Sequence, residues 1–100
     1  MKSSWTSLLG LANRAGKCVS GEELVLNEIR KRRAKMILLA NDASANTRKK
    51  VIDKCTYYQI PYYIVPNRYE LGNAIGKEQR VTVAVIDNGF TEKLKTLIDQ

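Results

Sequence analysis

Residues 21–33 hold the side chains best suited to chemistry with a charged ligand. The segment begins with the carboxylates of Glu22 and Glu23 and ends in four consecutive cations, residues 30–33. Clustered cations bind phosphates, whereas a carboxylate accepts hydrogen bonds from amino groups on base edges. The segment therefore suggests a surface that meets a polyanion, and charge alone leaves open which end does the recognition.

Each end of this segment also has a structural explanation. Cations in the last turn of a helix offset the helix macrodipole by about 0.3–1 kcal/mol each, which accounts for much of the basic run without a ligand. At the other end, Ser20 and Glu23 have the spacing of a capping box. Exposed backbone N–H groups at Gly21, Glu22 and Glu23 suit phosphate or base acceptors, but two carboxylates repel phosphate. The residues alone favour capping as the role of these carboxylates.

A loop later in the chain is the second candidate site. It lies between Gly76, a typical helix stop, and the apolar residues 81–86. Loops held by rigid elements often carry function, and this one offers hydrogen-bonding side chains beside an apolar contact for an unstacked base. Its candidate residues are Lys77, Glu78, Gln79, Arg80, Val81 and Thr82. An ordinary solvated loop is the alternative.

The residue types exclude several kinds of catalytic and metal site. The chain has no histidine, so histidine general bases, Ser-His-Asp triads and histidine metal ligands are impossible. Cys18 and Cys55 are far apart in the sequence, and two thiols alone cannot make a zinc site. We therefore expect free thiols packed in the core, no metal, no cofactor and no enzymatic activity.

Size and charge favour one nucleic-acid-binding domain. One hundred residues with 44% hydrophobic content are enough for one folded domain, residues 1–100. Seventeen Lys and Arg against ten Asp and Glu give a net charge of +7, which favours an anionic partner. The first residues do not have the pattern of a secretory signal, and no apolar run approaches the roughly 18 residues of a membrane span. We expect a cytoplasmic, monomeric protein that does not enter membranes.

Helical patterns alternate with short apolar segments throughout the chain. A first helix is predicted after a cap at Ser4 or Thr6 and ends near residues 14–16, and further helices are predicted at about 21–33, 45–58 and 68–75 and after the turn at 88–89. Strands are predicted at 34–40, 62–65 and 81–86, with an extended link at 17–20. This order implies a compact α/β sandwich around a small central sheet. The strand directions do not follow from the pattern.

Several segments together resemble a known family. They are Gly21-Glu22-Glu23-Leu24-Val25, Ala34-Lys35, Ala40-Asn41-Asp42-Ala43-Ser44, Ile60-Pro61-Tyr62, and Glu70-Leu71-Gly72 followed by Gly76-Lys77. Their order and spacing resemble the kink-turn RNA-binding ribosomal protein family, the L-seven-Ae and L-thirty-e group, and within it the bacterial YlxQ-type members. The resemblance covers nearly the whole chain.

The resemblance implies a three-layer α-β-α sandwich with a small mixed four-stranded sheet, and kink-turn RNA, ribosomal RNA included, as the ligand. In such proteins the N-terminus of the second helix enters the RNA major groove at tandem sheared G·A pairs, and the loop after the fourth helix covers a flipped-out nucleotide. The implied RNA-binding residues are Lys17, Gly21, Glu22, Glu23, Leu24, Asn27, Lys31 and Asn41, with loop residues 77–82.

The chain departs from the family pattern at the helix site. Many relatives contact the guanines with an Asn, the Glu that follows it, and a Lys three residues after that Glu. In this chain the three positions hold Glu23, Leu24 and Asn27. Asn41 stands where many relatives place a Glu that contacts the flipped base. Because Leu24 cannot hydrogen-bond a base, we expect guanine recognition to shift to Glu22, Glu23 and Asn27, or to be weaker.

Two functions from different classes fit these observations. The first is a non-catalytic protein that stabilises kinked RNA on or near the ribosome. The second is a protein-interaction module of the translation machinery whose charge gives only non-specific RNA affinity. An enzyme acting on RNA is disfavoured, because histidine and clustered carboxylates for a metal are both lacking.

Overall fold

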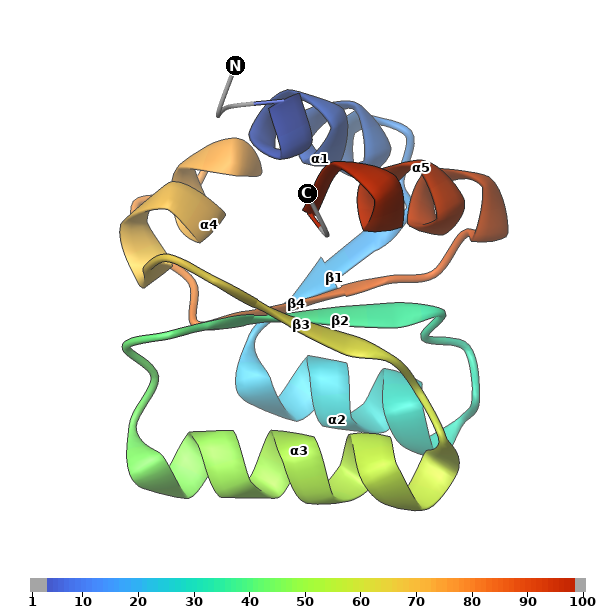
Figure 1. Ribbon diagram of the computed structural model, residues 1–100, viewed down its shortest axis with the longest axis vertical. Coiled ribbons are helices and arrows are strands. Elements are labelled where there is room, and N and C mark those ends of the chain that lie inside the picture. Colours follow the sequence, from blue (N-terminus) through green and yellow to red (C-terminus); the bar gives the residue numbers. More distant parts are fainter. Residues whose placement is uncertain (1–3, 99–100) are drawn as a thin grey trace.

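The computed structural model describes residues 4–98 and places a four-stranded sheet between two layers of helices (Figure 1). Along the chain the elements are α1 (Ser4–Arg14), β1 (Cys18–Ser20), α2 (Glu22–Arg30), β2 (Met36–Ala40), α3 (Ala45–Tyr58), β3 (Tyr62–Val65), α4 (Arg68–Ala74), β4 (Thr82–Val85) and α5 (Asn88–Ile98). Helices α1, α4 and α5 cover one face of the sheet, and α2 and α3 cover the other. The predicted three-layer α-β-α sandwich is confirmed.

The sheet is mixed, with strand order β1-β4-β2-β3. β2 and β3 run parallel, with Leu38 opposite Tyr63, whereas β4 is antiparallel to both of its neighbours. The carboxyl ends of β1, β2 and β3 therefore lie at one edge, where β4 begins; we call it the carboxyl edge. Helices α2, α3 and α4 all start there (Figure 1). In open α/β sheets, ligands usually bind beyond the carboxyl ends of strands.

β2 forms the centre of the core. All five of its residues are fully buried, as a short and continuously apolar strand predicts. Met36, Leu38 and Ala40 pack toward α1, α4 and α5, whereas Ile37 and Leu39 pack toward α2 and α3. One central strand thus fixes both helical layers, and the carboxyl edge is held by α2 and α3 from one side and α4 from the other.

The start of α2 differs from the predicted capping box. The helix begins at Glu22, its N-cap is Gly21 (φ 100°, ψ 142°), and no side chain caps it. Ser20 ends β1 instead, and its hydroxyl accepts a hydrogen bond from Nε of Arg80 at 3.3 Å. Glycine adopts a positive φ readily, so the chain turns one residue later than the spacing of Ser20 and Glu23 predicts.

The end of α2 also differs from the prediction, which extended the helix to residue 33. The helix ends at Arg30, and Arg32 has the left-handed φ of 60°. Arg33 turns back and donates two hydrogen bonds of 2.8 Å to the Glu28 carboxylate. This ion pair lowers the pKa of Glu28, chiefly through the hydrogen bond from Arg33. The basic run is therefore a folded corner and only its first residue is helical.

The remaining differences are small. The predicted link at 17–20 contains the edge strand β1, in which Val19 pairs with Ala84 of β4. The strand predicted from residue 34 begins at Met36. The last helix begins at Asn88, within the predicted turn, because the Asp87 carboxylate accepts a hydrogen bond from the Phe90 N–H at 2.9 Å. The predictions of α3 and β3 are confirmed.

Both cysteines are free thiols, as predicted. Cys55 is buried between the sheet and α3, and Cys18 is half-buried against the other core layer. Burial raises the pKa of each thiol to about 12. Across residues 4–98, none of the helices has the length and hydrophobicity that crossing a membrane requires.

Candidate nucleic-acid interface

The N-terminus of α2 presents backbone donors to the carboxyl edge. Two neighbouring helices have side-chain caps: Ser44 accepts a hydrogen bond from the Thr47 N–H at the start of α3, and Asn67 accepts two at the start of α4. Helix α2 has only Gly21 at its N-cap. The first N–H groups of a helix have no partners within it, so this terminus can donate to acceptors of a ligand.

Glu22 is occupied by a structural contact between α2 and α3. One of its carboxylate oxygens accepts a hydrogen bond from the Thr47 hydroxyl at 2.8 Å, and the other pairs with Nζ of Lys50 at 3.0 Å. The bond from Thr47, followed by that from Lys50, lowers the pKa of Glu22. Glu22 therefore neither caps its helix nor offers a free carboxylate to a base.

Glu23, Leu24 and Asn27 form the outer surface of the first turns of α2. Glu23 and Leu24 are exposed, and 57% of Leu24 is accessible. Asn27 is half-buried, and its Oδ1 accepts a hydrogen bond from Arg30 at 2.6 Å, which leaves its amide donors for a ligand. Of the two predicted carboxylates at the start of α2, only Glu23 is thus available to accept hydrogen bonds from base amino groups.

Two predicted cations lie away from the carboxyl edge. Lys31 is the C-cap of α2, so the nine residues of the helix separate it from Gly21 by a rise of about 15 Å. Lys17 precedes β1 at the opposite edge, where its carbonyl accepts a hydrogen bond from the Ile86 N–H after β4. Both side chains are exposed, but the fold does not bring them to the other candidates.

The loop 76–81 packs directly against α4. A Cβ on Gly72 would lie only 2.4 Å from the Gln79 Cα, so only glycine allows this close approach. The Gly72 carbonyl accepts a hydrogen bond from the Lys77 N–H at 2.9 Å, and Gly76 has the positive φ of 77° that starts the loop. Lys77, Glu78 and Gln79 are exposed. Gly72 and Gly76 therefore allow the loop to pack against α4.

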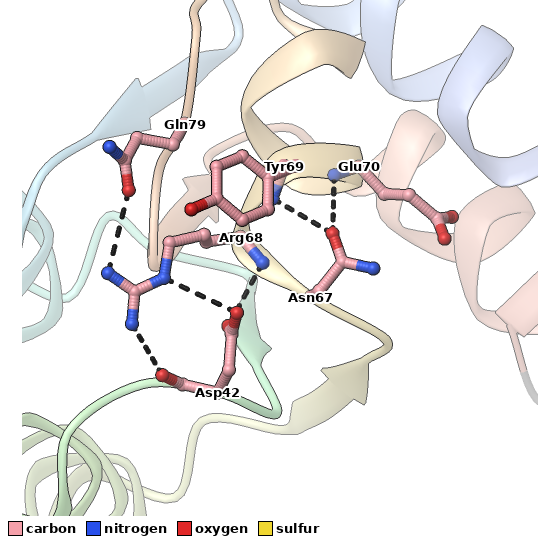
Figure 2. Close-up of polar contacts among 6 residues, drawn as sticks. All are labelled: Asp42, Asn67, Arg68, Tyr69, Glu70 and Gln79. Atoms are coloured by element: carbon pink, nitrogen blue, oxygen red, sulfur yellow. Dashed lines mark hydrogen bonds and ion pairs between the residues drawn. The ribbon is translucent and has the colours of Figure 1, made fainter.

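Arg68 joins the loop to the end of β2 (Figure 2). Its guanidinium donates to the Asp42 carboxylate at 3.3 Å, to the Asp42 carbonyl at 2.6 Å and to the Gln79 side chain at 3.5 Å. Its backbone N–H donates to the same carboxylate at 3.0 Å, and its carbonyl accepts from the Arg80 N–H at 3.1 Å. One arginine thus holds two of the predicted contact segments in a fixed relation.

Backbone hydrogen bonds connect the loop to α2 and β2. The Gly21 N–H donates to the Thr82 carbonyl at 3.3 Å, and the Ala40 N–H donates to the Val81 carbonyl at 2.8 Å. Thr82 is fully buried and its hydroxyl donates to the Leu38 carbonyl, so its side chain supports the loop and is not presented to a ligand. Val81 is half-buried.

Asn41, Arg80 and the α2 start complete the surface. Asn41 is exposed directly after β2, and its N–H donates to the Val65 carbonyl. Arg80 is half-buried beside Ser20, immediately before Gly21. The fold therefore brings the start of α2, the loop and Asn41 to one edge of the sheet.

Arg68 and Asp42 help to shape the candidate surface, and sequence reasoning missed both. A signal was present for Arg68, because a cation in the first turn of a helix opposes the macrodipole. Such a residue indicates a carboxylate partner outside the helix, and Asp42 provides it.

Comparisons with known proteins agree with this architecture. The model of the ribosomal protein L7Ae/L30e/S12e/Gadd45 family matches residues 3–95. RNA-binding protein YlxQ of Bacillus subtilis (strain 168) is 62% identical over 95 residues, which cover 95% of each chain. The structure of a Bacillus halodurans protein of unknown function has a TM-score of 0.94 at 47% identity and covers 98% of this chain and 99% of its own.

A more distant structure shows the same fold. The 15.5kD RNA binding protein of Giardia lamblia has a TM-score of 0.84 at 14% identity, over 98% of this chain and 85% of its own. The family match and the Bacillus subtilis relative both extend over nearly the entire chain. This chain therefore belongs to the ribosomal protein L7Ae/L30e/S12e/Gadd45 family.

Proposed function

We propose that this protein is a non-catalytic RNA-binding protein that recognises kink-turn RNA at the carboxyl edge, as a cytoplasmic monomer on or near the ribosome. The observation that carries the proposal is the uncapped start of α2, joined to the loop 76–81 by the hydrogen bond from Gly21 to Thr82. The Bacillus subtilis relative is named as an RNA-binding protein, which supports RNA as the ligand.

The net charge of the protein and the helix dipoles at the carboxyl edge suit a sharply bent RNA. A kink brings phosphates together, and a protein of net charge +7 offsets part of their repulsion. Helices α2, α3 and α4 point their positive dipole ends at the same edge. Lys77 and Arg80 add side-chain cations there.

The residues of the edge divide into two roles. Glu23 and Asn27 face outward from the first turns of α2 and would read base edges at the tandem G·A pairs. The loop, with Val81 as its apolar residue and Lys77 and Gln79 exposed, would cover the flipped-out nucleotide.

A titration against two RNA duplexes tests the proposal. One contains a kink-turn, and in the other Watson–Crick pairs replace the G·A pairs. We expect the protein to prefer the kink-turn by at least about tenfold, since the lost base contacts contribute on the order of 1–3 kcal/mol each. Equal affinity for the two duplexes would refute kink-turn recognition.

A double substitution tests the assignment of the reading end. Glu23→Ala with Asn27→Ala should reduce the preference for the kink-turn by about fivefold or more. Glu92→Ala with Asn88→Ala removes the same groups from α5, on the other face of the sheet, and should leave the preference unchanged. If both double variants lose the preference for the kink-turn to a similar extent, Glu23 and Asn27 are not the residues that discriminate between the two duplexes.

The alternative function predicts a different result. A protein-interaction module should bind both duplexes equally and should still co-sediment with ribosomes when Glu23 and Asn27 are replaced. A kink-turn-dependent protein should lose co-sedimentation together with RNA discrimination.

A further inference from the structure

The proposed function does not use the basic corner that follows α2. Residues 28–35 contain five cations, Arg30, Lys31, Arg32, Arg33 and Lys35, against the single carboxylate of Glu28. This local net charge of +4 is more than half of the +7 of the whole chain. Because α2 and α3 run side by side from the carboxyl edge, the corner lies at the far end of both helices (Figure 1).

The corner contacts a pair of tyrosines at the end of α3, of which Tyr57 is exposed and Tyr58 is half-buried. The Arg32 guanidinium carbon lies 5.0 Å from the ring centroid of Tyr58, in cation–π geometry. Tyr58 contacts Tyr57 edge to face, with ring centroids 4.9 Å apart. Tyr57 is 77% exposed, more than any other large hydrophobic residue among those described. We call the four cations 30–33 together with Tyr57 and Tyr58 the basic–aromatic surface.

A hollow connects this surface with the carboxyl edge. It has a volume of about 400 Å³, lies between α2 and α3, and is lined by Glu23, Leu26, Arg30, Lys50, Asp53 and Lys54. Glu23 is in the first turn of α2 and Arg30 is its last residue, so the hollow extends along the helix. A strand leaving the carboxyl edge could follow it past Arg30 and Lys54 to the exposed tyrosine.

We propose that the basic–aromatic surface binds single-stranded RNA that flanks the structured element held at the carboxyl edge. This inference rests on the proposed function for its first contact. Single-strand sites combine cations that follow the backbone with aromatic faces on which bases stack, and both are present here. Tyr57 offers an open ring face, and the neighbouring cations attract phosphates.

Compensation of helix dipoles explains only part of this arrangement. The corner lies at the negative ends of α2 and α3, so its charge stabilises both helices. That role needs cations but not an exposed tyrosine. Compensation of the dipoles also does not explain why position 32 holds an arginine, because its left-handed backbone favours glycine.

The test compares a kink-turn duplex with the same duplex carrying about ten unpaired nucleotides, a length within the range of single-strand sites. The extension is placed on each strand end in turn, and affinity is measured by fluorescence anisotropy. The unmodified protein should bind one extended RNA at least about fivefold more tightly than the duplex alone, the lower limit for one stacked base.

Two variants test whether the gain in affinity from the extension depends on the basic–aromatic surface. Arg32→Gly and Tyr57→Ala should each abolish it and leave the affinity for the unextended duplex unchanged. Both positions are exposed, and Arg32→Gly relieves the left-handed backbone, so folding should be retained. Lys93→Ala removes one exposed charge from α5 on the other face of the sheet and should keep the gain.

The inference is overturned if no extension increases the affinity, if the gain survives both variants, or if Lys93→Ala reduces it as much as Arg32→Gly. These outcomes can be distinguished from a failure of the proposed function. A protein that fails to distinguish G·A from Watson–Crick duplexes refutes kink-turn recognition, whereas the gain from the extension can be measured on either duplex.

Discussion

Gly72→Ala should separate the stability of this fold from its binding of RNA. Gly72 lies in α4, and a Cβ there would meet the Gln79 Cα, C and N at 2.4, 2.6 and 2.7 Å. Ordinary contact begins near 3.4 Å, so the loop backbone must move by about 1 Å to admit one methyl group. The displaced residues are those proposed to cover the flipped nucleotide.

The expected change in stability is moderate. Overpacking of this kind destabilises a protein by about 1–3 kcal/mol, whereas replacing glycine by alanine inside a helix stabilises it by about 1 kcal/mol. A net loss of up to about 2 kcal/mol should lower the melting temperature by up to roughly 15 °C. With a typical stability of about 5 kcal/mol or more, nearly all of the protein stays folded at 25 °C.

The affinity for kink-turn RNA should fall further than stability explains, by about tenfold or more, because the loop moves while the protein remains folded. Gly89→Ala is the matched control. Gly89 lies in the first turn of α5, beyond the other end of β4, and its added Cβ would meet only the side-chain oxygen Oδ2 of Asp87, at 3.2 Å. A side chain can move by the few tenths of an ångström that this contact requires, so stability and RNA affinity should both stay close to those of the parent protein.

The reasoning is refuted if Gly72→Ala binds kink-turn RNA with unchanged affinity at 25 °C. It is also refuted if Gly89→Ala loses as much affinity as Gly72→Ala, since the effect would then not depend on the loop. Thermal denaturation followed by circular dichroism gives the stability, and fluorescence anisotropy gives the affinity.

Three further predictions concern single groups. Arg68→Lys should lower RNA affinity several-fold and the free energy of unfolding by no more than about 1 kcal/mol, because one ammonium group cannot bridge Asp42 and Gln79 together. Fluorescence anisotropy measures the affinity, and denaturant titration measures the stability. The pKa of Glu22 is below its usual 4.5, so the ionised carboxylate should stabilise the fold above pH 4.5, and this stabilisation should be lost as the pH falls through the pKa of the folded state. The difference in unfolding free energy between the parent protein and Glu22→Gln, measured by denaturant titration, should therefore shrink from pH 7 to pH 3. With thiol pKa values raised to about 12, alkylation by iodoacetamide at pH 8 should be slow when the protein is folded and fast in denaturant.

The elements with unambiguous local signals were predicted from the sequence. Helix α3 follows the cap residue Ser44 and ends before Pro61, and β2 is a short apolar run between charged residues. Tertiary contacts changed the ends of α2. Arg and Lys are good helix formers, so nothing local indicates that Arg33 turns back to Glu28 or that Arg32 lies over Tyr58.

The candidate site was predicted in outline and not in detail. The resemblance pointed to the start of α2 and the loop, which the fold brings to one edge, but the sequence could not show that Glu22 is paired with Lys50 or that Thr82 is buried. Both facts depend on residues more than 20 positions away in the chain. The bridge by Arg68 was missed for the same reason, since Asp42 and Gln79 meet it only after β2, α4 and the loop are assembled.

The distribution of charge along α2 follows from the two tasks that we propose for it. A basic reading end would attract any phosphate and would increase non-specific binding as much as specific binding. Glu23 beside uncapped N–H groups repels phosphate but can still pair with base amino groups, so this end adds discrimination at low general affinity. The cations at the other end add affinity that depends on salt and little on sequence. Raising the salt concentration should therefore weaken the contribution of the basic–aromatic surface more than the preference for G·A pairs.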